Sequence, residues 1–334
     1  MRLPCLVNQK HFTKIVATPF GVAAFNSSTM ANKLKIGLLE FGIRENSLNN
    51  SKKSLYDIID YASRADELGF SRFWVTENYF SKAHDMAWST PEMLIPILLG
   101  LTEKIKIGIA GVILPLQSPF RVAHNYKLLS SLYPRRLDLG FVKGLVGEYD
   151  LKYFNVDVDK DNYFSSFLPK LESTLSFLRD ESEFLKKDLI IPPYKGNIPD
   201  VWYMGSSHSG LKVALEHDLN FARSIFHGES NKEYLKEELQ NFKAAYKAKY
   251  GKEPSMVLTF SGCCHKTKQK AINVAKKSTN NDISNISLVG DGNFFQEKLL
   301  EFKELYGYNE FMFNNIARSH KDSLTAIEIL SQYV

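Results

Sequence analysis

The sequence predicts an α/β protein whose fold is a (β/α)8 barrel with a long insertion between its fourth and fifth strands. Short apolar strands alternate with amphipathic helices over residues 34–334, as is typical of parallel sheets. The alternation gives eight strand–helix units, the number that closes a barrel of this type. No GxGxxG motif follows any of these strands, which argues against an open, doubly wound sheet with the same alternation.

The eight predicted strands share one composition. Each is a short run of β-branched, aromatic or leucine residues flanked by polar or glycine-containing turns, a pattern typical of buried strands. In chain order they cover residues 33–41, 73–77, 105–114, 137–142, 201–205, 221–226, 256–262 and 310–314.

The helices between these strands are predicted from apolar spacing and from end signals. In the first helix, apolar residues recur every three or four positions from Leu55 to Leu68, and Gly69 ends the helix. The second begins at residues 89–92 (Ser-Thr-Pro-Glu), where a capping residue precedes a proline and an acid. The predicted helices cover residues 54–68, 89–102, 118–132, 164–178, 209–217, 232–250, 269–277, 293–305 and 323–332.

One connection departs from the regular spacing. Residues 145–200, between the fourth and fifth strands, form a segment far longer than an ordinary connection of a parallel barrel. Its helix is predicted over residues 164–178. We expect the remainder of the segment to form loops over the barrel mouth, the end at which the strands have their carboxyl termini.

Residues 1–33 differ in character from the rest of the chain. They contain no Asp or Glu and show neither helical nor strand periodicity, and Met30 stands shortly before the first strand. A start set upstream of Met30, a targeting peptide and a disordered tail are the three alternatives. We interpret residues 1–33 as a dispensable or disordered extension, and residues 34–334 as the barrel domain.

Composition and missing motifs exclude several classes of protein. The formal net charge is +5, and Arg2, Lys10 and Lys14 supply three of these charges, so the barrel is nearly neutral and no nucleic-acid partner is expected. No uninterrupted apolar run reaches membrane-spanning length, so we expect no membrane partner. Three cysteines cannot form a disulfide framework and indicate a cytoplasmic protein. P-loop, HExxH, CxxC and GxSxG motifs are missing from the sequence, and no metal site is predicted.

Candidate site residues follow from the ends of the predicted strands, because active sites of such barrels lie there. Residues 205–210 (Gly-Ser-Ser-His-Ser-Gly) lead from the fifth strand directly into a helix. Hydroxyl groups, exposed N–H groups and the helix dipole favour an anion at this position, with Lys143 as the counter-charge. Alternatively, Ser206 only caps the helix and Lys143 is solvated. The residues alone leave these two interpretations at equal weight.

Four ordered blocks of sequence resemble the bacterial luciferase-like flavin monooxygenase family. The resemblance extends over residues 34–332, and the blocks are 73–79 (FWVTENY), 89–94 together with 107–123, 136–144 (RLDLGFVKG) and 199–207 (PDVWYMGSS). This resemblance implies a barrel that binds FMN, usually as a dimer.

The activity implied by the resemblance is that of a two-component monooxygenase. A separate flavin reductase supplies reduced FMN, which reacts with O2 to give a C4a-hydroperoxide that oxygenates a small organic substrate. The missing GxGxxG motif agrees with a separate reductase. An F420-dependent dehydrogenase of the same superfamily and a non-catalytic flavin-binding subunit are the alternatives. Asn78 keeps the non-catalytic alternative open, because the family often has His at this position and Asn cannot act as a general base.

The resemblance also assigns residues to the site. Ala110-Gly111 falls where the family has a strained, often cis, peptide beneath the flavin ring. The other cofactor contacts would come from Lys143, Gly144, Leu145, Gly205, Ser206 and Ser207. The catalytic candidates are Glu77, Asn78, Tyr79 and His84, and the substrate pocket would contain Phe41, Trp88, Phe226 and His227.

Overall fold

The computed structural model describes residues 33–44, 47–79, 86–88, 90–144, 147–154, 161–226, 236–284 and 286–334, without the side chains of residues 47–50. The predicted extension, apart from Lys33, lies outside the described residues. The candidates His84, Leu145 and His227 also lie outside them, so their roles stay predictions.

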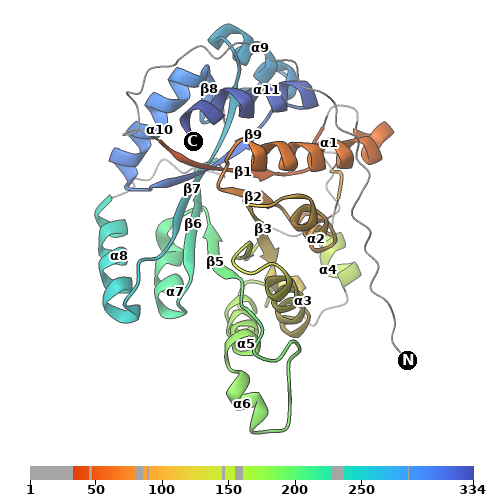
Figure 1. Ribbon diagram of the computed structural model, residues 1–334, viewed down its shortest axis with the longest axis vertical. Coiled ribbons are helices and arrows are strands. Elements are labelled where there is room, and N and C mark those ends of the chain that lie inside the picture. The colour runs from red at the N-terminus through yellow and green to blue at the C-terminus, as the bar shows by residue number, and fades with distance from the viewer. Residues whose placement is uncertain are drawn as a thin grey trace, which may run out of the picture. The chain divides into compact units, whose positions relative to one another are not determined.

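Eight parallel strands close into a barrel, as predicted (Figure 1). Each strand pairs with its neighbour in the chain, and pairings of β6 with β7 and of β1 with β9 complete the ring. The barrel strands are β1 (Lys35–Glu40), β2 (Arg72–Val75), β3 (Lys106–Ile113), β4 (Leu137–Val142), β5 (Asp200–Gly205), β6 (Asn220–Ser224), β7 (Met256–Cys264) and β9 (Glu310–Asn315).

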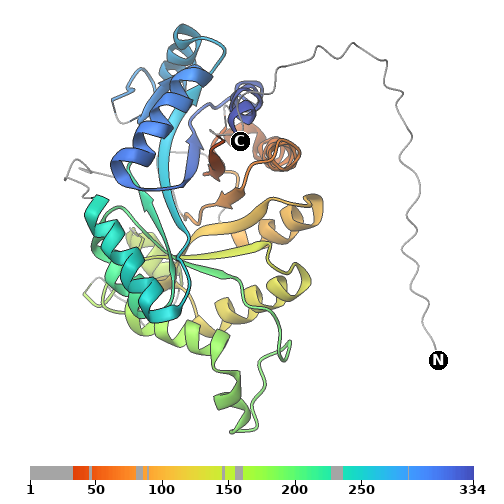
Figure 2. The same cartoon turned by 60° about the vertical axis from the view of Figure 1, so that its left-hand side comes forward.

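Helices surround the strands (Figure 2). They are α1 (Ser47–Glu67), α2 (Pro91–Leu101), α3 (Pro119–Leu132), α4 (Glu148–Phe154), α5 (Phe167–Arg179), α6 (Glu181–Leu185), α7 (Leu211–Glu216), α8 (Lys236–Tyr250), α9 (Lys268–Ser278), α10 (Gly292–Tyr306) and α11 (His320–Leu330). Short 3-10 segments η2 (Leu114–Leu116), η3 (His208–Gly210) and η4 (Ser331–Tyr333) adjoin α3, α7 and α11. No helix in the described part of the chain is long and apolar enough to cross a membrane.

Local sequence explains where several helices begin and end. Pro91 and Pro119 occupy the first positions of α2 and α3, where a missing backbone N–H costs nothing. The Asp291 side chain caps α10 by accepting a hydrogen bond from the Phe294 N–H at 3.1 Å. Gly307 ends the same helix in the left-handed region, with φ of 75°.

The barrel differs from the predicted element order near the C-terminus. An extra strand, β8 (Leu288–Gly290), pairs with the last residues of β7 outside the closed ring. The predicted eighth barrel strand is therefore β9. Three residues are too few for the periodic pattern on which sequence-based strand prediction depends.

The connection between β4 and β5 contains helices where loops were expected. The predicted middle helix is present as α5, which packs against α3. Residues 181–199 do not lie over the mouth: the Lys127 ammonium, near the middle of α3, pairs with Glu181 and donates to the Ile191 carbonyl at 2.8 Å. Figure 1 shows α6 beyond the end of α5, away from the strands. The expectation of loops over the mouth is wrong for this part, because a buried lysine holds the segment along α3.

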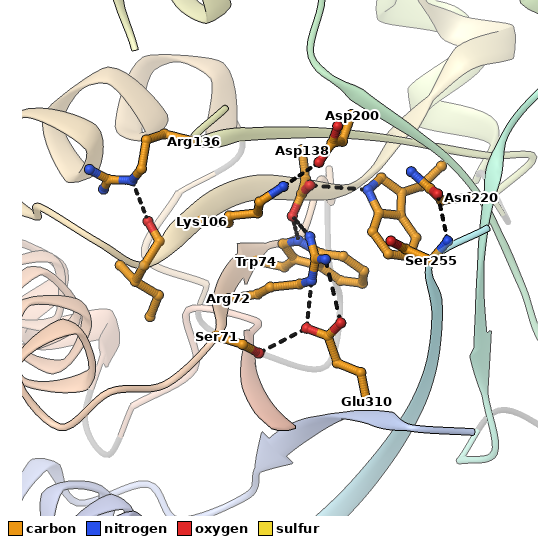
Figure 3. A network of polar contacts seen from close by, with 12 residues as sticks. Ser71, Arg72, Trp74, Lys106, Arg136, Asp138, Asp200, Asn220, Ser255 and Glu310 are labelled. Carbon is orange, nitrogen blue, oxygen red and sulfur yellow. Dashed lines mark hydrogen bonds and ion pairs between the residues drawn. The ribbon is translucent and has the colours of Figure 1, made fainter. Parts of the chain in front are cut away.

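Charged residues fill the amino-terminal end of the barrel interior (Figure 3). Arg72 Nη1 lies 2.6 Å from Asp138 Oδ2, and Arg72 Nε lies 2.6 Å from Glu310 Oε1. The indole N–H groups of Trp74 and Trp202 donate to Asp138 at 2.8 and 3.1 Å. This network links β2, β4, β5 and β9 and satisfies the buried charges at the end opposite the mouth.

Candidate functional site

The mouth of the barrel is apolar. Phe41, Val142 and Phe226 lie at or just after strand ends, and together with Ala110 of β3 they pack on the apolar cluster inside the barrel. The rings of Phe41 and Phe226 meet edge to face with their centroids 6.1 Å apart, which joins the ends of β1 and β6. Two predicted pocket residues are thus brought together. Such a surface suits a planar, largely apolar ring and keeps water away from it.

Trp88, another predicted pocket residue, does not join this pair. It is buried in the outer cluster between strands and helices, and its indole N–H donates to the Thr76 carbonyl at 2.9 Å. Its ring packs on Gly42, whose φ is +77°, and a Cβ there would lie 2.6 Å from the indole. Trp88 therefore supports the loop that carries Phe41.

Lys143 and the Gly-Ser-Ser turn lie at the ends of neighbouring strands. β4 pairs with β5 with Phe141 opposite Tyr203, and Lys143 and Gly205 each follow two residues later. The backbone at Lys143 is held by Tyr163, whose hydroxyl donates to the Lys143 carbonyl at 2.6 Å. The structure therefore brings the predicted cation and the predicted hydroxyl-rich turn to one edge of the mouth.

The hydroxyl groups of the turn are accessible. Ser206, Ser207 and Ser209 are exposed, and the hydroxyls of Ser207 and Ser209 lie 2.8 Å apart. The residue that caps η3 is Ser207 rather than Ser206, because the Ser207 hydroxyl accepts from the Ser209 N–H at 3.4 Å. Hydroxyl and ammonium groups donate hydrogen bonds to phosphate oxygens, so this edge fits an anion.

Two aromatic rings support this edge from below. Lys143 Nζ lies 5.9 Å from the Phe167 ring centroid, and Phe167 packs edge to face on Tyr203 at 5.9 Å. Gly210 lies so close to Tyr203 that a Cβ on it would be 2.0 Å from the ring. The last glycine of the turn is therefore required by packing, and the turn and Lys143 share one aromatic support.

Ala110 and Gly111 lie at an irregular point of β3. The peptide bond between them is cis, and the pairing with β4 changes register between Ile109 and Val112. A Cβ on Gly111 would lie 2.8 Å from the backbone of Gly140 in β4. The structure thus shows that glycine is needed here for the close approach of β3 and β4, while Ala110 is the member of the pair that packs at the mouth.

Glu77 has a strongly perturbed carboxyl group near the mouth. Its carboxylate is buried and accepts hydrogen bonds from the Ile113 N–H at 2.6 Å, from the Gln117 side chain at 2.5 Å, and from the Tyr79 hydroxyl. Burial raises the pKa of Glu77 to about 7, against the lowering effect of these three donors. The Glu77 carboxyl group therefore exchanges a proton near neutral pH.

Tyr79 connects Glu77 to the mouth. Its hydroxyl donates to Glu77 and accepts from the Gln117 amide at 3.1 Å, and burial together with Glu77 raises its pKa far above the usual value. Its ring packs with Phe154, and both Tyr79 and Val142 pack against the cluster that contains Ile113. Tyr79 is therefore neutral, with its hydroxyl directed to Glu77 and its ring at the end of β4.

Asn78, between these two residues, bonds to a residue of the same segment that follows β2. Its side-chain amide donates to the Thr76 hydroxyl at 2.8 Å, and the side chain is half-buried. An amide has no titratable proton in this pH range, so Asn78 contributes polarity and shape only.

Three contributors to this region were missed in the sequence. Gln117 completes the Glu77 cluster, and His208 and Arg223 lie behind the hydroxyl turn. No sequence signal identified Gln117, because its role depends on the course of the β3–α3 connection. Among the described residues, no cluster of three or more His, Cys, Asp or Glu is arranged to hold a metal ion.

Comparison with known proteins decides the family. The family described as luciferase-like monooxygenase matches residues 37–310, which is most of the barrel. The chain belongs to the luciferase-like monooxygenase family. Membership makes it an enzyme of the oxidoreductase class, a flavin-dependent monooxygenase, as the resemblance implied.

Two relatives from Bacillus subtilis illustrate the range of the family. The uncharacterized protein YwcH is 26% identical over 320 residues, covering 85% of this chain and 94% of that protein. An N-acetyl-S-alkylcysteine monooxygenase is 29% identical over 214 residues, covering 62% of this chain and 63% of that protein. The chain thus spans nearly all of the first relative and slightly less than two thirds of the second.

Several solved structures of other proteins share the barrel. Apo-MsnO8 matches with a TM-score of 0.75 at 21% identity, covering 90% of this chain and 98% of that chain. The oxygenating constituent of 3,6-diketocamphane monooxygenase from Pseudomonas putida, solved with FMN, matches with a TM-score of 0.68 at 16% identity, covering 90% of this chain and 96% of that chain. An F420-dependent secondary alcohol dehydrogenase matches with a TM-score of 0.63 at 13% identity, covering 90% of this chain and 98% of that chain. At these identities the likeness shows the fold alone.

Proposed function

We propose that the protein is an FMN-dependent, two-component monooxygenase that uses reduced FMN and O2 to oxygenate a small organic substrate. The observation that carries the proposal is the position of Lys143 beside the exposed hydroxyls of Ser206 and Ser207, next to the apolar mouth. FMN has the matching chemistry, because it joins a terminal phosphate to a planar ring.

The chain's own residues would bind and orient the cofactor. Lys143 supplies a positive charge and the turn hydroxyls donate to phosphate oxygens, while Gly144 and Gly205 shape the adjoining backbone. Phe41, Val142 and Phe226 exclude water from the ring. Bound reduced flavin would supply the electrons that activate O2.

Glu77 is the proton-exchanging group that this proposal assigns. Its carboxyl has a pKa of about 7 because it is buried, and it accepts a hydrogen bond from Tyr79, which packs on the same cluster as Val142. A group that titrates near the working pH is suited to both taking and giving a proton. Glu77 would thus supply the acid–base function that Asn78 cannot provide.

The reductant would come from a second protein. The sequence contains no dinucleotide-binding GxGxxG motif, so the chain lacks the usual means of taking hydride from a nicotinamide. A separate flavin reductase is therefore the partner that we propose.

Anaerobic titration with reduced FMN and with reduced F420 tests the cofactor assignment. The proposal predicts a single saturable site for reduced FMN and at least tenfold weaker binding of F420, about 1.4 kcal/mol. Preferential binding of F420 would favour a dehydrogenase. Tight binding of reduced FMN with no acceleration of its reaction with O2 would favour a non-catalytic flavin-binding subunit.

The outer faces of α2 and α3 support a homodimer, which we also propose. Exposed apolar side chains recur at four-residue intervals on α2, where Met93, Ile97 and Leu101 are 68%, 49% and 56% exposed. On α3, Leu128 and Leu132 are 51% and 63% exposed with the same spacing. In a dimer with a two-fold axis, the patch of one protomer packs against the same patch of its partner. Both apolar patches are then buried without requiring a charged partner.

A further inference from the structure

His208 stands between the two serines that line the hydroxyl turn, but its side chain points the other way. Its side chain is 10% exposed, whereas Ser207 and Ser209 are exposed. Because the two serines flank a single inward side chain in a tight 3-10 turn, anything that fixes His208 also fixes both hydroxyls.

Three groups from other elements hold the imidazole. Nδ1 lies 2.7 Å from a carboxylate oxygen of Glu238 in α8. Nε2 lies 3.3 Å from the Tyr308 hydroxyl, before β9, and 3.4 Å from Nη1 of Arg223 in β6. The turn is thereby connected to α8, to β6 and to the segment that leads into β9.

The chemistry of these partners fixes the tautomer. Arginine has donors only, so the Nε2 atom facing Arg223 accepts a hydrogen bond and carries no proton. The proton is then on Nδ1, which donates to the Glu238 carboxylate. Burial and the Arg223 charge lower the pKa of His208, so the imidazole stays neutral and keeps this orientation.

Arg223 also contacts the backbone of the turn. Its side chain is buried, and Nε donates to the Ser206 carbonyl at 3.4 Å. Burial lowers the pKa of Arg223 to about 10, which leaves it cationic at neutral pH. A positive charge therefore lies directly behind the turn, on the side away from solvent.

We propose that His208, oriented by Glu238 and Arg223, is a positioning residue that presents the Ser207 and Ser209 hydroxyls to the phosphate of the flavin. The inference rests on the proposed function and goes beyond it, because it assigns phosphate recognition to a network that does not touch the ligand. It implies that breaking the network weakens the binding of a phosphorylated flavin. The binding of the same flavin without its phosphate should not change.

The test compares reduced FMN with reduced riboflavin, which has the same ring and no phosphate, in anaerobic titrations of the full chain. Glu238→Ala removes the carboxylate at a half-exposed position, where folding should survive. His208→Leu removes the imidazole itself. We expect each variant to bind reduced FMN about tenfold more weakly, as one lost hydrogen bond implies, and riboflavin with unchanged affinity. Glu238→Gln should restore most of the FMN affinity.

A second His–carboxylate pair provides the matched control. His320 Nε2 lies 2.8 Å from Asp60 Oδ2 between α11 and α1, and the Asp60 side chain is 62% exposed, close to the 53% of Glu238. Asp60→Ala should leave the affinity for both flavins unchanged.

Two results would overturn the inference. In the first, wild type prefers FMN to riboflavin and Glu238→Ala keeps that preference, so the phosphate site stands without the His208 network. In the second, Glu238→Ala weakens both flavins equally, so the network serves the fold rather than the phosphate. Equal affinity of the wild type for FMN and riboflavin would instead reject the proposed phosphate site, and with it this inference.

Discussion

At the scale of single residues, Glu77 links the site to the stability of the protein. Its pKa is raised from 4.5 to about 7, so between these pH values the folded protein holds a proton that the unfolded chain has released. The free energy of unfolding therefore falls as the pH rises through this range, by up to about 3 kcal/mol from this group.

Glu77→Gln should remove that pH dependence, because an amide does not titrate. Denaturant unfolding of wild type and variant at pH 4.5, 6 and 8 measures the difference. The two unfolding free energies should lie closest at pH 4.5, where both side chains are neutral in the folded protein, and should separate as the pH rises, since the wild type loses stability and the variant does not. Parallel pH profiles would show that Glu77 is ionised in the folded protein throughout.

Two glycines of the hydroxyl turn differ in the space around them. A Cβ on Gly210 would lie 2.0 Å from the Tyr203 ring, while a Cβ on Gly205 would make an ordinary contact at 3.5 Å. Gly210→Ala should therefore lower the unfolding free energy by about 1–3 kcal/mol, because the Tyr203 ring is held by Phe167 of α5 and Phe221 of β6. Gly205→Ala is the control and should change it by about 0.5 kcal/mol or less. Equal effects, measured by thermal unfolding, would contradict the packing described for this turn.

At the scale of elements, the site depends on two adjacent strand ends. Lys143 follows β4 and Ser206 follows β5, so each strand positions one part of the proposed phosphate site. The double substitution Lys143→Ala with Ser206→Ala should weaken binding of reduced FMN by about 2–4 kcal/mol, since two charge-assisted contacts are lost. Both positions are exposed, so the melting temperature should stay near that of wild type. Unchanged FMN affinity in a folded double variant would reject the site.

The strands themselves depend on the ion network at the opposite end of the barrel (Figure 3). Arg72→Met would leave the buried carboxylate of Asp138 without its cation and Glu310 with only the exposed Lys35, and should lower the unfolding free energy by about 3–5 kcal/mol. Lys106→Met breaks the pair with Asp200, whose side chain is 46% exposed, and should cost about 1 kcal/mol or less. Urea unfolding compares the two, and equal losses would show that the network contributes no more than a surface pair.

Strand order and most helix positions can be predicted from the sequence. The directions in which the side chains point can be predicted only in part. β4 was predicted with its observed bounds, because apolar periodicity and a turn on each side define it. The turn at residues 205–210 and its neighbour Lys143 were also predictable, since parallel strand ends share one edge. Trp88 and Gln117 were not, because their positions depend on how long loops fold back on the barrel.

At the scale of the whole molecule, the apolar patch on α2 and α3 predicts the oligomeric state. Ile97→Lys with Leu128→Lys places charges in the patch and should convert a dimer to a monomer in sedimentation velocity at micromolar concentration. Leu305→Lys changes an equally exposed leucine on α10 and should leave the dimer intact. A wild-type protein that sediments as a monomer would exclude the homodimer.

The whole account depends on one arrangement, an anion-binding edge beside an apolar mouth, and on the oxygen chemistry proposed for it. The most direct measurement is to mix the anaerobic complex of protein and reduced FMN rapidly with O2 and to record absorbance spectra. We predict a transient species whose spectrum differs from both reduced and oxidised FMN, and whose decay is slowed by the water-excluding mouth. Oxidation at the rate of free reduced FMN, with no transient, would contradict the proposed monooxygenase function.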